Sequence, residues 1–154
     1  METLAADSLR SAWESVYART SYVVQLPAGE LPIRIGQTCP VLDAFLRARA
    51  VRTWAFVSAC NPRSHALCEQ ENLARHENLL RAAAALGLTC CNGEGRSDAA
   101  DGPAERGLLI TGITEVLALE LGLEFEQNAI VFGERDGVAR LLWCDEEYRD
   151  KSCE

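Results

Sequence analysis

The apolar segment "TWAFVSA", residues 53–59, constrains the fold more than any other part of the chain. Almost every side chain in it is aromatic, β-branched or small, a pattern typical of a central strand that is buried on both faces. The pair Asn61 and Pro62 ends this strand. A helix of about six turns is predicted to follow from Ser64 to Leu86, with Gly87 ending it.

Weaker strand and helix patterns flank this segment on both sides. Strands are predicted at 22–26, 33–35, 88–91, 106–112, 127–133 and 138–144, and further helices near 8–17, 40–46 and 114–123. We therefore expect a single α+β domain over residues 1–144, with a central mixed sheet of about six or seven strands covered by about four helices. Residues 92–105 lack periodicity and are rich in Gly, Asp and Ala, which predicts a long exposed loop. The charged residues 145–154 are expected to form a frayed tail.

Charge and hydropathy exclude two classes of partner. The chain has 23 acidic and 15 basic residues, a net charge of −8 at pH 7. Proteins that bind the nucleic-acid backbone cluster Lys and Arg, so no nucleic-acid partner is expected. The first residues resemble no signal peptide, and no segment reaches the roughly 20 apolar residues that a membrane span needs. An acidic, soluble, cytoplasmic protein with no membrane partner is expected.

Cysteine occurs seven times, at spacings that form no disulfide framework, so free thiols are expected. Zinc-ligand types occur at Cys60, His65, Cys68, Cys90 and Cys91, but the spacing C-x4-H-x2-C matches no common zinc finger. Neither a metal nor a cofactor is expected. Cys60 is predicted close to a helix N-terminus, which would favour a thiolate nucleophile. No histidine is assured beside it, however, and no catalytic residue is assigned.

The junction between the central strand and the long helix is the first candidate site. Open α/β sheets place ligands at the carboxyl ends of strands, and a helix N-terminus offers unpaired N–H groups to an anion. Ser58, Asn61, Arg63 and Ser64 lie at this junction. The alternative is structural: Asn61 and Ser64 cap the helix, and Pro62 shapes the turn.

Three polar residues of the predicted helix extend this candidate site. Asn72, Arg75 and His76 project from the apolar side of the helix, in its first half. A buried amide or guanidinium must form hydrogen bonds, either with other protein groups or with a ligand in a cleft. Arg75 would pair with an anionic ligand in the second case. His76 is expected to be a core histidine, because no nucleophile or base is recognisable beside it.

Several motifs together resemble a bacterial family catalogued as domain of unknown function 3293. They are "TSYVV", "IGQTCPVLDAFL", "WAFVSACNPRS", "EQENLARHENLL" and "EFEQNAIVFG", in this order. The resemblance implies a small bacterial cytosolic protein and no established activity. It places the family's polar signature on Ser58, Asn61, Pro62, Ser64, Asn72, Arg75, Gln127 and Asn128. The family's Trp-x-Glu element is incomplete here: Glu105 matches the acid, the Trp is absent, and Gly107 stands where Ser is expected.

Two functions from different classes are compatible with these residues. In the first, Ser58, Asn61, Arg63, Ser64, Asn72, Arg75, Gln127 and Asn128 bind a small anionic or polar ligand. In the second, the polar residues form an internal network in a non-enzymatic interaction module whose protein partner is unknown. Enzyme status stays open, because no general base is evident. A cavity over Asn61, Asn72, Arg75 and Gln127 favours the ligand site, whereas an Arg75 sealed against internal carboxylates opposes it.

Overall fold

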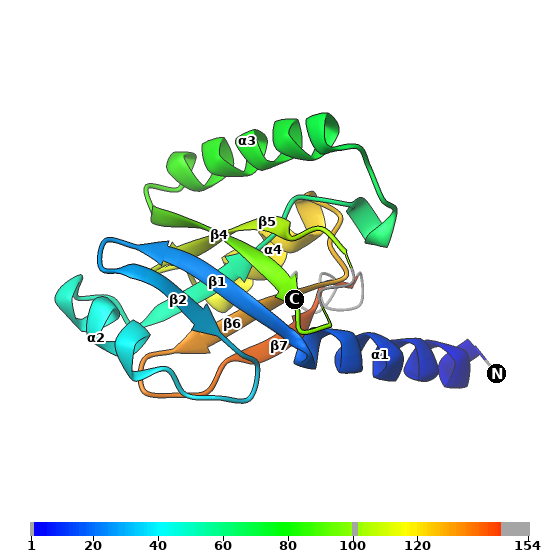
Figure 1. Cartoon of the computed structure of the whole chain (residues 1–154), viewed down its shortest axis with the longest axis horizontal. Helices are drawn as coiled ribbons and strands as arrows, with labels where there is room; N and C mark the ends of the chain where they lie inside the picture. The colour runs from blue at the N-terminus through cyan, green and yellow to red at the C-terminus, as the bar shows by residue number, and fades with distance from the viewer. Residues whose placement is uncertain (1, 100–101, 146–154) are drawn as a thin grey trace.

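The computed structural model describes residues 2–99 and 102–145, with side chains from Arg10 onward, and these residues form four α-helices and a seven-stranded sheet (Figure 1). Of the predicted tail 145–154, residues 146–154 lie outside the described residues. In chain order the elements are α1 (Glu2–Ala18), β1 (Thr20–Leu26), β2 (Gly29–Ile33), α2 (Pro40–Ala48), β3 (Thr53–Val57), a 3-10 turn (Pro62–Ser64), α3 (Glu69–Ala85), β4 (Thr89–Ser97), β5 (Glu105–Thr111), α4 (Glu115–Glu124), β6 (Ala129–Glu134) and β7 (Arg140–Trp143).

The α+β class is confirmed, whereas the sheet differs from the expected mixed sheet in strand direction. The strand order is β2-β1-β4-β5-β3-β6-β7, and all six neighbouring pairs are antiparallel. Helices α3 and α4 each connect two parallel strands, β3 with β4 and β5 with β6. In both cases another strand lies between the two, so no neighbours are parallel. The resulting β3-α3-β4-β5-α4-β6 unit has the connectivity of a split β-α-β fold.

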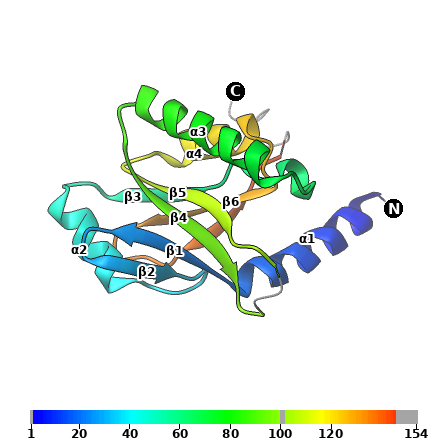
Figure 2. The same cartoon turned by 45° about the horizontal axis from the view of Figure 1, so that its top comes forward.

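The predicted central strand β3 lies between β5 and β6 and separates two cores. Ala55 and Val57 face α3 and α4, which cover one side of the sheet with Leu79 and Leu119 (Figure 2). Trp54 and Phe56 alternate to the other side. All four strand residues from 54 to 57 are buried, as the apolar run predicted.

The second side of the sheet is concave. The sheet curls so that the chain after β2 meets the chain before β7, through a bridge between Ile35 and Ala139. Helix α2 packs its Leu42 and Leu46 into this side. Helix α1 projects from the body of the molecule and meets the sheet at its C-terminal end (Figures 1 and 2).

Three predicted boundaries were wrong for identifiable reasons. Strand β2 covers Gly29–Ile33 rather than 33–35, because the turn before it is short and Gly29 already pairs with Leu26. Helix α3 begins at Glu69 rather than Ser64, because Ser64 has a positive φ angle and His65 and Cys68 have extended backbone, which an α-helix cannot contain. The long loop expected over 92–105 is much shorter, because β4 continues to Ser97. Strand β4 pairs with β1 on one side and with β5 on the other. This pairing outweighs the poor strand propensity of its second half, which contains two glycines and is followed by an aspartate.

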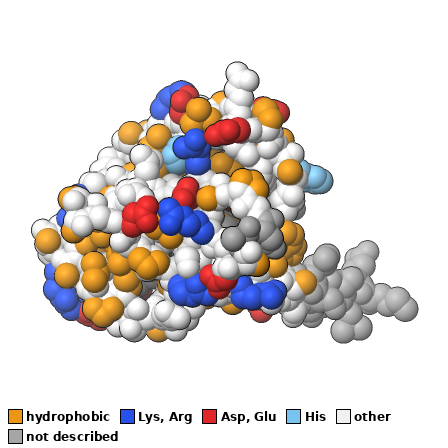
Figure 3. All heavy atoms as spheres, viewed as in Figure 1, with side chains coloured by type: hydrophobic (Ala, Val, Ile, Leu, Met, Phe, Trp, Pro, Cys, Tyr) orange, Lys and Arg blue, Asp and Glu red, His pale blue; other side chains and the backbone are white. Residues whose placement is uncertain are grey.

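The surface carries charges of both signs. On the face shown in Figure 3, basic and acidic side chains lie next to one another rather than in a patch of one sign. Ion pairs of this kind join Arg34 to Asp98, and Arg96 to both Glu30 and Glu94. Within the described ranges, no helix combines the length and the apolar character needed to cross a membrane.

Candidate functional site

A cavity of about 290 Å³ lies on the concave side of the sheet, between the sheet and the C-terminal part of α1. Antiparallel pairing explains its position, because the end of β3 lies beside the starts of β5 and β6, and the end of β4 lies beside the start of β1. Several strands contribute two residues each to the cavity wall. The two residues are two positions apart, because alternate side chains of a strand lie on the same face of the sheet. These pairs are Thr20 with Tyr22, Phe56 with Ser58, Gly95 with Ser97, and Ala129 with Val131.

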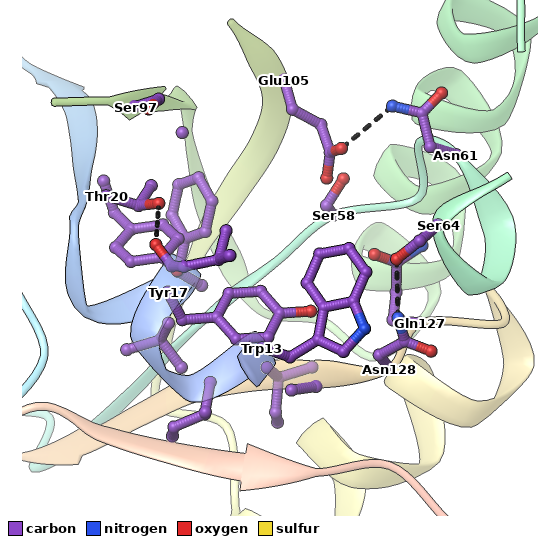
Figure 4. A pocket seen from close by; sticks show the side chains of 18 of the residues that line it. Trp13, Tyr17, Thr20, Ser58, Asn61, Ser64, Ser97, Glu105, Gln127 and Asn128 are labelled. Atoms are coloured by element: carbon purple, nitrogen blue, oxygen red, sulfur yellow. Dashed lines mark hydrogen bonds between the residues drawn. The ribbon is translucent and has the colours of Figure 1, made fainter. Parts of the chain in front are cut away.

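Five of the eight predicted site residues line this cavity. They come from the turn after β3 and from the segment before β6: Ser58, Asn61, Ser64, Gln127 and Asn128. The two segments are linked directly, since the Asn128 amide donates to the Ser64 hydroxyl at 2.7 Å (Figure 4). Gln127 is buried, and its amide donates to the carbonyls of Cys60 and Phe125. The predicted site residues at 58–64 and at 127–128, far apart in the sequence, are therefore neighbours in the fold.

The other three predicted residues, Arg63, Asn72 and Arg75, lie outside the cavity wall and form hydrogen bonds within the protein. Arg75 donates to the carbonyl oxygens of Ala59 at 2.5 Å and Phe125 at 2.6 Å, and its Nη1 lies 3.6 Å from the Glu126 carboxylate. Arg63 donates to the carbonyl of Gln127 at 2.7 Å. The guanidinium groups thus tie the turn after β3 to the chain between α4 and β6.

Asn61 connects this internal network to the cavity. Its backbone N–H donates to Asn72 Oδ1 at 2.9 Å, and its own Oδ1 accepts from Asn72 Nδ2 at 2.8 Å and from the Leu67 N–H at 3.0 Å. The side-chain Nδ2 of Asn61 donates to Glu105 Oε2 at 3.0 Å (Figure 4). Asn72 therefore holds Asn61 in a left-handed conformation, and Asn61 in turn holds Glu105.

Glu105 is the one charged side chain among the described residues that line the cavity. It begins β5, beside the end of β3, and is partly buried. Burial raises the pKa of Glu105 above its ordinary value, against the opposing effects of the hydrogen bond from Asn61 and of the neighbouring Ser58 hydroxyl, which itself donates to the carbonyl of Arg106. No arginine or lysine side chain of the described ranges forms an ion pair with Glu105.

Aromatic side chains form the opposite part of the wall. Trp13 and Tyr17 come from α1, with ring centroids 6.1 Å apart, and Tyr22 packs against Phe56 at 5.2 Å. Burial, with a smaller effect of the Glu105 charge, raises the pKa of Tyr17 to about 12. The hydroxyl of Tyr22 is buried and forms no hydrogen bond with the described residues.

These aromatic residues and Glu105 were not included in the predicted site. Trp13 and Tyr17 belong to an apolar helix stripe that sequence alone cannot distinguish from a core-facing one. A usable signal was present in the T-x-Y motif, because Thr20 and Tyr22 must share one face of a strand and both line the cavity. The family's acid, matched at Glu105, was a second such signal.

The cavity floor depends on a cross-strand glycine pair. Gly93 of β4 lies opposite Gly107 of β5, and a Cβ at Gly107 would lie 2.4 Å from the Phe56 ring. A Cβ at Gly93 would lie 3.0 Å from the same ring. The serine that the family resemblance leads one to expect at 107 would therefore displace Phe56 in this chain.

The remaining reactive side chains lie elsewhere. Cys60 is buried behind the wall, and burial raises the pKa of its thiol, which disfavours the nucleophilic thiolate. His76 is buried in the core side of α3, with its Nε2 3.2 Å from Asn92 Oδ1, in agreement with the core-histidine interpretation. Within residues 2–99 and 102–145, no three His, Cys, Asp or Glu side chains are grouped to hold a metal ion.

The change Glu105→Gln is expected to raise the free energy of unfolding at pH 7 and to have a smaller effect at about pH 4. The folded-state pKa lies above the ordinary 4.5, so the native protein retains the proton to higher pH than the unfolded chain. The wild type therefore loses stability as the pH rises through the folded-state pKa, whereas the glutamine variant does not. Urea unfolding of both proteins at the two pH values measures the difference. A variant less stable than the wild type at pH 7 would contradict this desolvation cost.

The chain is similar to one protein family, but to no individual protein of known function or structure. No curated protein and no solved structure matches the chain. The segment from the end of β3 to the start of β6 includes every predicted site residue and most of the split β-α-β unit. Residues 57–130 match the model of the family described as protein of unknown function (DUF3293), which confirms over this segment the resemblance that the sequence motifs predicted.

Proposed function

We propose that the cavity between α1 and the concave side of the sheet binds a small molecule with a polar end and an apolar body. The observation that carries this proposal is the composition of the wall, which has convergent polar groups on one side and aromatic rings on the other. The hydroxyl of Tyr22 supports it further: it is buried and has no hydrogen-bond partner among the described residues, whereas buried polar groups in native proteins normally have one.

The polar end of the ligand would lie at Ser58, Asn61 and Glu105, with Gln127 and Asn128 beside them. An anion is disfavoured for two reasons. Arg63 and Arg75 donate to backbone carbonyls rather than face the cavity. The N–H groups of Asn61, Arg63 and Ser64 are also occupied, by Asn72, Glu126 and Asn61 respectively. We therefore propose a neutral or cationic polar ligand and no binding role for Asn72 or Arg75.

The internal network does not by itself favour the interaction module. Asn72 and Arg75 form such a network, but its last member, Asn61, faces the cavity and holds a cavity carboxylate. A network that ends on a cavity wall is what preorganisation of a binding site requires. This continuity supports the ligand site as the function of the polar residues.

A screen of small molecules by thermal shift, with a cavity-filling variant, tests the proposal. Gly95 lies on the wall, and a Cβ there would meet only ordinary contacts, the nearest 3.5 Å away at Thr20. The leucine in Gly95→Leu would therefore extend into the cavity without a backbone clash. Compounds with an aromatic or aliphatic body and an N–H or O–H end should raise the melting temperature of the wild type and not of Gly95→Leu.

The matched control is Gln25→Leu, which adds the same side chain at an exposed position of β1. It should respond to ligands as the wild type does. Nucleotides, sugar phosphates and carboxylic metabolites form the anionic part of the panel and are expected to have no effect. Hits that stabilise Gly95→Leu as strongly as the wild type, or no hits across the panel, would overturn the proposed cavity site.

A further inference from the structure

We propose that Glu105 and the aromatic rings around it bind a protonated amino group, so that the ligand of the cavity is a small amine with an apolar body. The inference rests on the proposed binding role of the cavity and specifies the chemical class of the ligand. Three observations on the described residues carry it: the unpaired carboxylate, the rings and the unpaired hydroxyl.

The carboxylate of Glu105 forms no ion pair with a basic side chain of residues 10–99 or 102–145. Its Oε2 accepts a hydrogen bond from Asn61, a neutral amide, at 3.0 Å. The neighbouring Arg106 lies within 3.6 Å of Glu69 instead. A partly buried carboxylate that has no ion pair is costly unless a proton or a cation neutralises it. An ammonium group in the cavity would supply that charge and donate hydrogen bonds to the carboxylate.

The rings of Trp13, Tyr17, Tyr22 and Phe56 suit a cation better than an anion. Their faces carry negative electrostatic potential, which attracts ammonium groups and repels carboxylates. Figure 4 shows the rings of Trp13 and Tyr17 lying across the cavity from Glu105 and Ser58. A cation held by Glu105 would therefore have an acid on one side and ring faces on another.

The hydroxyl of Tyr22 is a buried acceptor beside the cavity, which a small movement of the ring would bring to a second N–H of the ligand. Tyr22 is 7% exposed, it lines the cavity, and its hydroxyl has no hydrogen-bond partner among the described residues. Burial raises its pKa well above the usual range, so the phenol stays neutral. A primary ammonium has three N–H donors, enough for Glu105, Tyr22 and one further oxygen such as that of Ser58.

Three probes with one body and different polar ends test the inference: 2-phenylethylamine, 2-phenylethanol and 3-phenylpropanoate, titrated by calorimetry at pH 7. The amine should bind the wild type at least about 10-fold more tightly than the alcohol, since a charge-assisted hydrogen bond and a cation–ring contact add to the shared body. The anionic probe, 3-phenylpropanoate, should not bind. Glu105→Gln should lower the affinity for the amine about 10-fold and change that for the alcohol by less than about 2-fold.

The control variant is Glu134→Gln, which removes the same charge from an exposed position at the end of β6. It should bind all three probes as the wild type does, and a thermal melt of each variant verifies its fold. If the alcohol binds as tightly as the amine, or Glu105→Gln weakens both equally, the amine inference is overturned while the proposed cavity site stands. If no probe binds the wild type, the inference and the proposed function are both contradicted.

Discussion

Replacing Arg75 with alanine is expected to lower the free energy of unfolding by about 3 kcal/mol, because hydrogen bonds to a charged group contribute about 1.5 to 3 kcal/mol each. Arg75 donates to Ala59, which is 0% exposed, and to Phe125 at the end of α4. The alanine variant leaves the buried carbonyl of Ala59 without this donor. For a chain of this length the melting temperature should fall by roughly 6 to 12 °C.

Arg81→Ala is the matched control, since it makes the same substitution in the same helix. Arg81 is exposed, and its partners among the described residues are two side chains of its own helix, Asn78 and Glu77. The control should change the free energy of unfolding by less than about 0.5 kcal/mol. Equal effects of the two substitutions would show that the Arg75 hydrogen bonds do not stabilise the fold. A stable Arg75→Ala that no longer binds an anionic ligand would restore the binding role first predicted for Arg75.

Replacing Gly133 with alanine is expected to destabilise the protein by about 2 to 3 kcal/mol, because overpacking a filled core typically costs 1 to 3 kcal/mol. Gly133 of β6 lies directly opposite Trp54 of β3, and the indole ring covers it. A Cβ at Gly133 would lie 2.6 Å from two carbons of that ring, closer than real Cβ atoms come. Trp54 is 3% exposed, so the ring has little room to move. Urea unfolding, followed by circular dichroism and tryptophan fluorescence, measures the effect.

Gly95→Ala is the control for the loss of a strand glycine. Its Cβ would meet atoms at 3.5 Å and beyond, so the substitution should be neutral or slightly stabilising. The pair Gly133→Ala and Trp54→Phe provides a second check. A smaller ring should recover part of the loss, giving a coupling of about 1 kcal/mol in a double-mutant cycle. Additive effects of the two changes would rule out the ring contact as the cause.

Local sequence patterns identified the helices and strands that have a clear hydrophobic period or clear capping and turn residues at their ends. The apolar run at 53–59 predicted the central strand. The helix predicted near 114–123 is α4, and the Thr114 hydroxyl caps it by accepting from the Leu117 N–H. The start of α3 was misplaced because the sequence Asn-Pro-Arg-Ser is also typical of a helix N-terminus. The left-handed conformation of Asn61 depends on Asn72, eleven residues further on, and such a contact leaves no local signal.

Strand β4 is a second case in which tertiary contacts, rather than local sequence, determined the secondary structure. The part of its sequence from Asn92 onward, with two glycines, predicts a loop, but both edges of β4 are paired, and its glycines make room for the Phe56 ring and the cavity wall. Propensity was outweighed by tertiary contacts from β1, β3 and β5.

The sequence by itself determined the α+β class and the central strand, and it singled out Ser58, Asn61 and Ser64, which line the cavity. Each of these depends on residues close together in the chain, where period and spacing carry the information. The tertiary structure alone decided which of those residues face a cavity. Antiparallel pairing brings Glu105, Tyr22 and the end of β3 together, and α1 adds the aromatic wall. The tertiary structure also directs Arg75 toward backbone carbonyls. The polar residues that follow "WAFVSA" therefore form both the wall of the cavity and the hydrogen-bond network behind it.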